Sequence, residues 1–170
     1  IGTGDDAALV ENPSGSSLVT ADMLIEGVHF DLKWTSLVDL GFKSLAVNLS
    51  DIAAMGGIPA YGIISLGLPA SFRAERLNEF YRGMNALARE SAVSIVGGDT
   101  SVAGSFLISV CLVGHAPYHP VSRSGAKENH DIYVTGTLGD AALGLELLKR
   151  KSPARRHAGA TYLLRRHHHP

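Results

Sequence analysis

The feature that most constrains the fold is the alternation of short apolar runs with amphipathic helical segments. From Thr35 to Met55, apolar residues recur at helical spacing and predict a helix with one core-facing side. A second helix is predicted over 71–91, with Ser71 as its N-cap. Strands are expected over 17–24 and 60–68, and in the runs "AVSIV", "FLISVCLVGH" and "DIYVTG".

The order of these segments predicts a single α+β domain over residues 1–150, with a mixed or antiparallel sheet flanked by helices. The segment "GGDTSVAGS" is rich in turn-forming residues, so the two apolar runs on either side of it are expected to form a hairpin. A helix capped near Asp140 and a last helical segment in "GATYLLRRH" follow. Residues 151–170 are expected to begin a connection to a further domain.

Composition narrows the classes of function. The chain has 170 residues and a formal net charge of −1, so there is no basic excess that would favour nucleic acid. No apolar stretch approaches the length of a membrane span. Cys111 is the one cysteine, which excludes an intrachain disulfide, and its apolar surroundings predict a buried thiol. These features favour a reducing, cytoplasmic setting.

Several carboxylates stand beside glycine turns and strand ends, in "GTGDD", "TADM" and "VGGDT". A hard cation such as Mg²⁺ is typically held by such oxygen ligands together with substrate phosphates. Each aspartate taken singly also suits a turn or a cap, but adjacent Asp5 and Asp6 exceed what a turn needs. Ser44, Asn48 and Asp51 form a polar stripe on the expected helix, and for this stripe alone a solvated face is the favoured interpretation.

The opening "IGTGDDAALV" matches the dinucleotide-binding pattern G-x-G-x-x-G/A, with Ala7 at its last position. In a true fingerprint the glycines follow a strand and open a long helix. Here the next residues, "ALVENPSG", are too short and too rich in Pro and Gly for that helix. A Walker-type phosphate loop is also absent from the sequence. A bound nucleotide would therefore be held through metals and carboxylates.

The chain resembles the N-terminal domain of bacterial thiamine-monophosphate kinase, of the aminoimidazole ribonucleotide synthetase-like superfamily. The resemblance rests on "GTGDDAAL", "TADMLIEGVHF", "KSLAVNLSDIAAMGG", "VGGDT", "RSGAK" and "IYVTGTLGDAALGL", which occur in this order. It implies transfer of the γ-phosphoryl group of ATP to thiamine phosphate, giving thiamine diphosphate, with Mg²⁺ as cofactor and no nucleophilic residue of the protein.

The resemblance also implies roles for individual residues. Ala21 departs from the family's "S-T-D" segment, so only its main-chain carbonyl could contact a metal. Lys127 and Tyr81 are interpreted as surface residues. The metal-binding positions are matched by Asp6, Thr20, Ala21, Asp22, Asp51 and Asp99, the ATP-binding positions by Gly98, Asp99 and Arg123, and a substrate-binding position by His29.

Members of the superfamily pair their N-terminal domains across a two-fold axis, so a homodimer that merges two sheets is expected. The family has a second domain with further site residues, which implies that this chain is the N-terminal half and inactive alone. Two alternatives stay open. The chain could belong to another ATP-using member, of the hydrogenase-maturation or purine-pathway type, or it could be a non-catalytic nucleotide-binding dimerisation module. A nicotinamide-binding oxidoreductase rests on the opening fingerprint alone.

Overall fold

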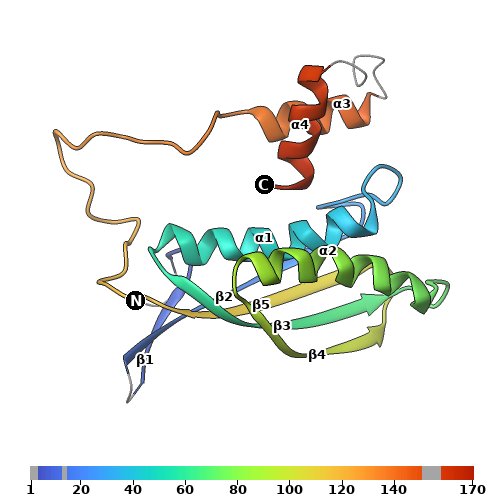
Figure 1. Ribbon diagram of the computed structural model, residues 1–170, viewed down its shortest axis with the longest axis horizontal. Coiled ribbons are helices and arrows are strands. Elements are labelled where there is room, and N and C mark those ends of the chain that lie inside the picture. The colour runs from blue at the N-terminus through green and yellow to red at the C-terminus, as the bar shows by residue number, and fades with distance from the viewer. Residues whose placement is uncertain (1–3, 13–14, 151–157) are drawn as a thin grey trace. The chain divides into compact units, whose positions relative to one another are not determined.

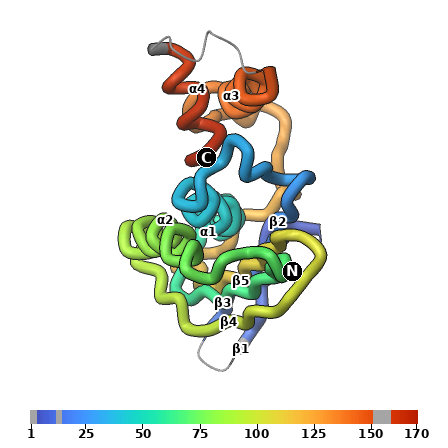
Figure 2. The backbone as a smooth tube through the Cα atoms, turned by 90° about the vertical axis from the view of Figure 1, so that its right-hand side faces the viewer, coloured from blue at the N-terminus to red at the C-terminus, as the bar shows by residue number. Residues whose placement is uncertain are grey.

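The computed structural model describes residues 4–12, 15–150 and 158–170. It divides into two compact units, Ile1–Gly125 and Ala126–Pro170. The first unit holds a five-stranded sheet and two helices that lie on one face of it, as Figures 1 and 2 show. No helix in the described part of the chain is long and apolar enough to cross a membrane.

The sheet has the strand order β1-β2-β5-β3-β4. Its strands are β1 (Ala8–Asn12), β2 (Gly15–Ile25), β3 (Ile58–Leu68), β4 (Ser94–Val102) and β5 (Leu107–His115). Neighbouring strands are antiparallel except β3 and β4, which are parallel. The predicted α+β class, with a mixed sheet flanked by helices, is confirmed.

Helix α1 (Leu37–Ala54) has clear sequence signals at both ends. The Ser36 hydroxyl caps its start by accepting from the Asp39 N–H at 3.1 Å, and it donates to the Asp39 carboxylate at 2.6 Å. Met55 is the C-cap, and Gly56 follows with φ +69, a left-handed conformation that favours glycine. The sequence-based limits of this helix are confirmed to within two residues.

The core lies between the sheet and the helix pair formed by α1 and α2 (Leu77–Glu90). Along β5, every second residue faces the helices: Ile108, Val110 and Leu112 are fully buried. The two helices approach closely where Gly41 and Gly83 lie. A Cβ on Gly41 would fall 1.9 Å from the Phe80 carbonyl oxygen, and one on Gly83 would fall 1.8 Å from the Val38 carbonyl oxygen.

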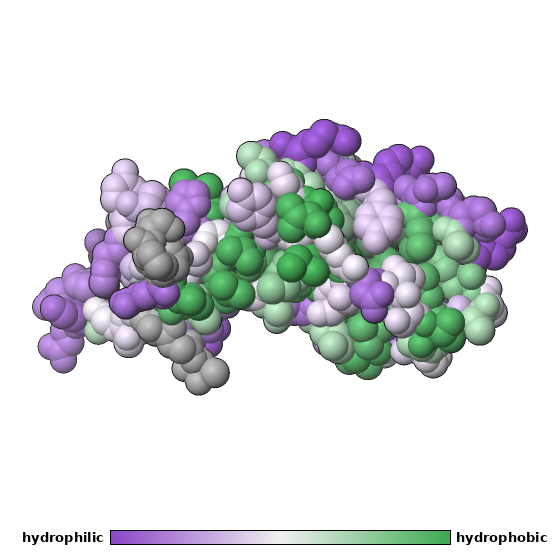
Figure 3. Space-filling model, turned by 90° about the horizontal axis from the view of Figure 1, so that it is seen from below, coloured by the Kyte–Doolittle hydropathy of each residue, from purple (hydrophilic) through white to green (hydrophobic). Residues whose placement is uncertain are grey.

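The opposite face of the sheet carries no described helix of the first unit and is partly apolar. Met23, Tyr61 and Ile63 are each about half exposed there, and Figure 3 shows apolar side chains gathered on the side seen from below. Cys111 lies opposite Ala21 and Ile63 in the register and is only partly buried, so the prediction of a buried thiol is wrong.

The second unit consists mainly of α3 (Asp140–Lys149) and α4 (Ala158–His168), preceded in the chain by irregular backbone. The helices pack closely, because a Cβ on Gly144 would lie 2.2 Å from the Leu163 carbonyl oxygen. Asp140 accepts hydrogen bonds from the Thr137 and Tyr162 hydroxyls. Both helices were expected from the sequence.

Four local predictions are wrong. The run 131–136 is irregular, and Ile132 and Tyr133 are almost fully exposed; a β-rich hexapeptide needs a neighbouring strand, and none pairs with it among the described residues. Ser71 is not an N-cap, because a 3₁₀ turn, η1 (Ala74–Arg76), precedes α2. The segment "GGDTSV" is strand rather than turn, and β4 and β5 form no hairpin, because β3 lies between them.

We predict that Gly41→Ala destabilises the protein by about 2–3 kcal/mol, because the added methyl group collides with main-chain atoms that cannot rotate away. Urea denaturation of the variant and the parent measures this difference. Gly104→Ala is the matched control, since a Cβ at Gly104 meets nothing within 4 Å, and its effect should stay below about 0.5 kcal/mol. Equal stability of the two variants would contradict the close helix crossing.

Candidate metal and nucleotide site

The polar stripe of α1 is buried against strand β2, and the interpretation of this stripe as a solvated face is wrong. Ser44 and Asn48 have no exposed surface. The Asn48 side chain accepts a hydrogen bond from the Asp22 N–H at 3.0 Å and donates to the Ser44 carbonyl at 3.1 Å. Because β1 pairs with β2 only as far as Val19, no described strand pairs with this stretch of β2 on that side. Asn48 supplies the acceptor that a strand would otherwise provide.

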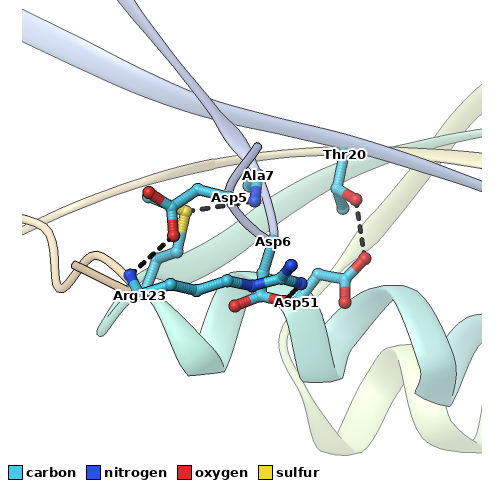
Figure 4. Close-up of polar contacts among 7 residues, drawn as sticks. Asp5, Asp6, Ala7, Thr20, Asp51 and Arg123 are labelled. Carbon is cyan, nitrogen blue, oxygen red and sulfur yellow. Dashed lines mark hydrogen bonds and ion pairs between the residues drawn. The ribbon is translucent and has the colours of Figure 1, made fainter. Parts of the chain in front are cut away.

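Thr20 and Asp51 connect the same strand and helix through their side chains. The Thr20 hydroxyl is buried and donates to an Asp51 carboxylate oxygen at 2.8 Å, as Figure 4 shows. Thr20 and Asp22 are two residues apart on β2, so both project towards the helix layer. The structure therefore brings Thr20, Asp22 and Asp51 together.

The Asp22 carboxylate is destabilised by its position. Burial raises its pKa, and the nearby negative charge of Asp51 raises it further, while His29 has a smaller opposing effect. The Nδ1 atom of His29 accepts a hydrogen bond from the Ile25 N–H at 3.1 Å. The neutral His29 ring therefore carries its proton on Nε2, which remains available as a donor.

The turn at residues 4–7 presents two carboxylates with different partners. An Asp5 oxygen accepts from the Arg123 N–H at 2.8 Å. The Asp6 carboxylate forms an ion pair with the Arg123 guanidinium, as Figure 4 shows, and this hydrogen bond holds the pKa of Asp6 below its usual value. Asp5 thus holds the neighbouring loop, while Asp6 and Arg123 place opposite charges side by side. Residues 1–3 of the opening fingerprint lie outside the described residues, but Ala8–Asn12 is a strand and not the helix that a dinucleotide loop requires.

Asp99 and Gly98 lie elsewhere, on the edge strand β4. The register places Asp22 opposite Val110, Val110 opposite Ile64, and Ile64 opposite Gly98. Gly98 is thus about 14 Å from Asp22, three interstrand spacings across the sheet. A Cβ on Gly98 would lie 1.8 Å from the Ile64 carbonyl oxygen, so the pairing of β3 with β4 itself requires glycine here.

Two cavities adjoin these groups. One, of about 310 Å³, is lined by Gly98, Asp99 and Tyr81 among others. The surface interpretation of Tyr81 is wrong, since this ring is partly buried, its pKa is raised by burial, and it packs edge-on against Phe80. Lys127 is exposed, as expected. The other cavity, of about 270 Å³, is lined by Asp22, His29 and Lys43 together with apolar side chains.

Lys43 and Asn48 were missed as site residues from the sequence. Burial lowers the pKa of Lys43, which places a partly desolvated ammonium in the cavity that also holds Asp22 and His29. The sequence offers no signal for Lys43, whose place in an amphipathic helix is equally typical of a surface lysine. Asn48 could have been found from the polar stripe, had it been assigned to the buried side.

The donor set suits a hard divalent cation. Asp6, Asp22 and Asp51 offer carboxylate oxygens and Thr20 a hydroxyl, whereas Ala21 offers only its main-chain carbonyl. In the described part of the chain no three His, Cys, Asp or Glu side chains lie close enough together to hold one ion. The residues of one chain therefore fit a cation that takes part of its coordination from water or from a phosphate.

Comparison with known proteins finds a protein family, named relatives and solved structures that resemble this chain. Residues 4–116 match the family described as AIR synthase related protein, N-terminal domain. The chain is 40% identical over 174 residues to a thiamine-monophosphate kinase of Bacillus subtilis (strain 168), covering 100% of this chain and 54% of that relative. A solved structure described as AaThiL complexed with AMPPCP and TMP matches with a TM-score of 0.91 at 37% identity, over 98% of this chain and 53% of that one.

A more distant match concerns the fold alone. The hydrogenase maturation protein HypE of E. coli matches with a TM-score of 0.58 at 22% identity, over 79% of this chain and 43% of that one, which shows a shared fold alone. The chain spans about half the length of the thiamine-monophosphate kinases that it matches.

We predict that Asp22→Asn raises the Tm of the metal-free protein at pH 7 by about 1–2 °C. Because the pKa of Asp22 is raised in the folded protein, the ionised carboxylate lowers the free energy of unfolding. This loss of stability is fully present above the folded-state pKa and absent below the unfolded-state pKa. The gain should therefore shrink as the pH falls from 7 towards 4. Thermal unfolding in the presence of a chelator measures it, and a variant less stable than the parent at pH 7 would contradict the assignment.

Proposed function

The chain belongs to the family of AIR synthase related proteins through its N-terminal domain, and on that premise we propose that it is the Mg²⁺- and ATP-binding half of a thiamine-phosphate kinase. The reaction is transfer of the γ-phosphoryl group of ATP to the phosphate of thiamine phosphate, giving thiamine diphosphate and ADP. The observation that carries the proposal is the pair Asp22 and Asp51, held by Asn48 and Thr20 beside the Asp6–Arg123 ion pair.

The relatives support this choice of reaction over others of the family. The relative in Bacillus subtilis bears the name of this kinase, at 40% identity over the whole of this chain. The structure with AMPPCP and TMP bound is similar over 98% of this chain. The likeness to the hydrogenase maturation protein is far weaker and concerns the fold alone.

In phosphoryl transfer, the acidic residues of this chain would hold cations and other residues would contact the nucleotide. Bound Mg²⁺ would supply positive charge that neutralises the phosphate oxygens during transfer. Asp6, Asp22 and Asp51 would each supply carboxylate oxygens to bound cations, without all three meeting on one ion, and Thr20 would keep the Asp51 carboxylate in one orientation. Asp99 and Gly98 would meet the nucleotide from β4, where the cavity beside Tyr81 lies.

Arg123 would bind the nucleotide by replacing its ion pair with Asp6 by an ion pair with a phosphate group. Its guanidinium is exposed and pairs with Asp6, so a phosphate oxygen can compete for the same donors. When Arg123 turns to phosphate, the Asp6 carboxylate is released for a cation. The main-chain bond from Arg123 to Asp5 keeps the loop in place during this exchange.

The acceptor would occupy the cavity lined by Asp22, His29 and Lys43. The hydrogen bond from the Ile25 N–H uses only Nδ1 of His29, so the Nε2–H can donate to the phosphoryl acceptor. The partly desolvated Lys43 ammonium gains from an anionic ligand more than an exposed lysine would. Together these two donors favour an acceptor that carries a phosphate, next to the carboxylate that would hold the metal.

We also propose that the protein is a homodimer that joins the uncovered faces of two sheets. Met23, Tyr61 and Ile63 leave that face apolar and accessible in one chain. With ATP as a substrate and a single cysteine, the cytoplasm is the proposed location.

The direct test is the chemistry of the full-length gene product. Incubated with ATP, Mg²⁺ and thiamine phosphate, it should form thiamine diphosphate and ADP in equal amounts, followed by chromatography. Removal of Mg²⁺ with a chelator, or replacement of thiamine phosphate by thiamine, should abolish product formation. Consumption of ATP only with a different acceptor would favour another member of the family, and nucleotide binding without turnover would favour a dimerisation module.

A further inference from the structure

Met55 lies where the two charged loops of the site meet the end of α1. Its side chain is 1% exposed. Its sulfur accepts a hydrogen bond from the Ala7 N–H at 3.1 Å, seen in Figure 4 as the dashed line from Ala7 to a sulfur atom. Its carbonyl oxygen accepts from the Val121 N–H, also at 3.1 Å. One residue therefore bonds two segments that are more than a hundred positions apart in the sequence.

Both segments carry charged groups of the proposed site immediately beside these bonds. Ala7 directly follows Asp6, and Val121 stands two residues before Arg123. The two segments also bond to each other, through the Asp6–Arg123 ion pair and the Asp5–Arg123 hydrogen bond. Met55 is thus the contact that ties this pair of loops to the helix carrying Asp51.

The backbone around Met55 leaves it little freedom to move. Gly56 has φ +69 and Gly57 donates to the Ile52 carbonyl at 2.8 Å, which ends the helix in a tight turn. A Cβ on Gly57 would lie 2.3 Å from a Leu18 methyl group, so the turn packs directly on strand β2. The sulfur therefore meets the Ala7 N–H at a position set by the helix and the sheet together.

A thioether is needed at this position for its lone pairs as well as for its volume. Ala7 is 3% exposed, so its N–H has no access to bulk water and depends on the sulfur as acceptor. Leucine would fill a similar volume without offering an acceptor. The Val121 contact uses the main chain and would survive the same exchange.

We propose that Met55 is a positioning residue, which sets the Asp6 carboxylate and the Arg123 guanidinium relative to Asp51 through the Ala7 N–H···S and Val121 N–H···O contacts. Its effect on nucleotide use rests on the proposed function; its effect on the Ala7 amide does not. Met55 is buried and would act only through the two loops.

The test is Met55→Leu in the full-length gene product, with two separate readouts. Amide hydrogen exchange at Ala7 should become at least about tenfold faster, because the N–H loses its acceptor, whereas exchange at Val121 should change less than about twofold. The KM for Mg–ATP should rise about five- to tenfold, with a much smaller change in kcat, because the loops are displaced while the chemistry is retained.

Met84→Leu is the matched control. Met84 is also fully buried, but on α2 and away from these loops, so the same exchange should leave both the Ala7 amide and the KM unchanged. An unchanged Ala7 exchange rate, or a faster one with an unchanged KM, overturns the proposal. If the parent protein shows no use of Mg–ATP at all, the proposed function fails, and the exchange of Ala7 still decides whether Met55 holds the turn.

Discussion

The site depends on a polar contact between α1 and β2 in an otherwise apolar interface. Asn48 accepts from the Asp22 N–H at the point where β1 no longer covers β2, and Thr20 donates to Asp51. Burying these groups is tolerable because their hydrogen bonds are satisfied. The contact sets the register of α1 on β2. It therefore also sets how closely the Asp22 and Asp51 carboxylates approach each other. An apolar helix face would pack equally well but would not specify that approach.

The same arrangement places a carboxylate where its negative charge lowers the stability of the folded protein. Burial and the nearby charge of Asp51 raise the cost of ionising Asp22, whereas the Asp6 carboxylate is stabilised by Arg123. A protein selected for stability alone would not place two aspartates against a buried asparagine and threonine. Such destabilising charge is typical of sites that bind a cation, and here it lies beside an arginine suited to phosphate. These charges would be complementary to those of the proposed Mg²⁺ and ATP.

Much of this could be predicted from the sequence, because the signals were local. The limits of α1 follow from Ser36, the apolar period and the glycines after Met55. What failed depended on tertiary partners. The Ser44–Asn48 stripe is identical in sequence to a solvated one, and only the packing of α1 on β2 makes it buried. The strand β4 and the irregular run at 131–136 likewise depend on which strand lies beside them. Lys43 and Met55 become informative only when their neighbours are known.

Asp51, held by Thr20 against β2, is proposed to serve a cation that binds together with nucleotide. The most direct measurement is calorimetric titration of the full-length gene product with AMPPCP, with and without Mg²⁺, for the parent and for Asp51→Asn. We expect Mg²⁺-dependent binding by the parent and a loss of at least about tenfold in affinity, near 1.4 kcal/mol, in the variant. The exposed Asp131→Asn should bind as the parent does. Equal Mg²⁺-dependent affinity in Asp51→Asn and the parent would rule out this role for Asp51.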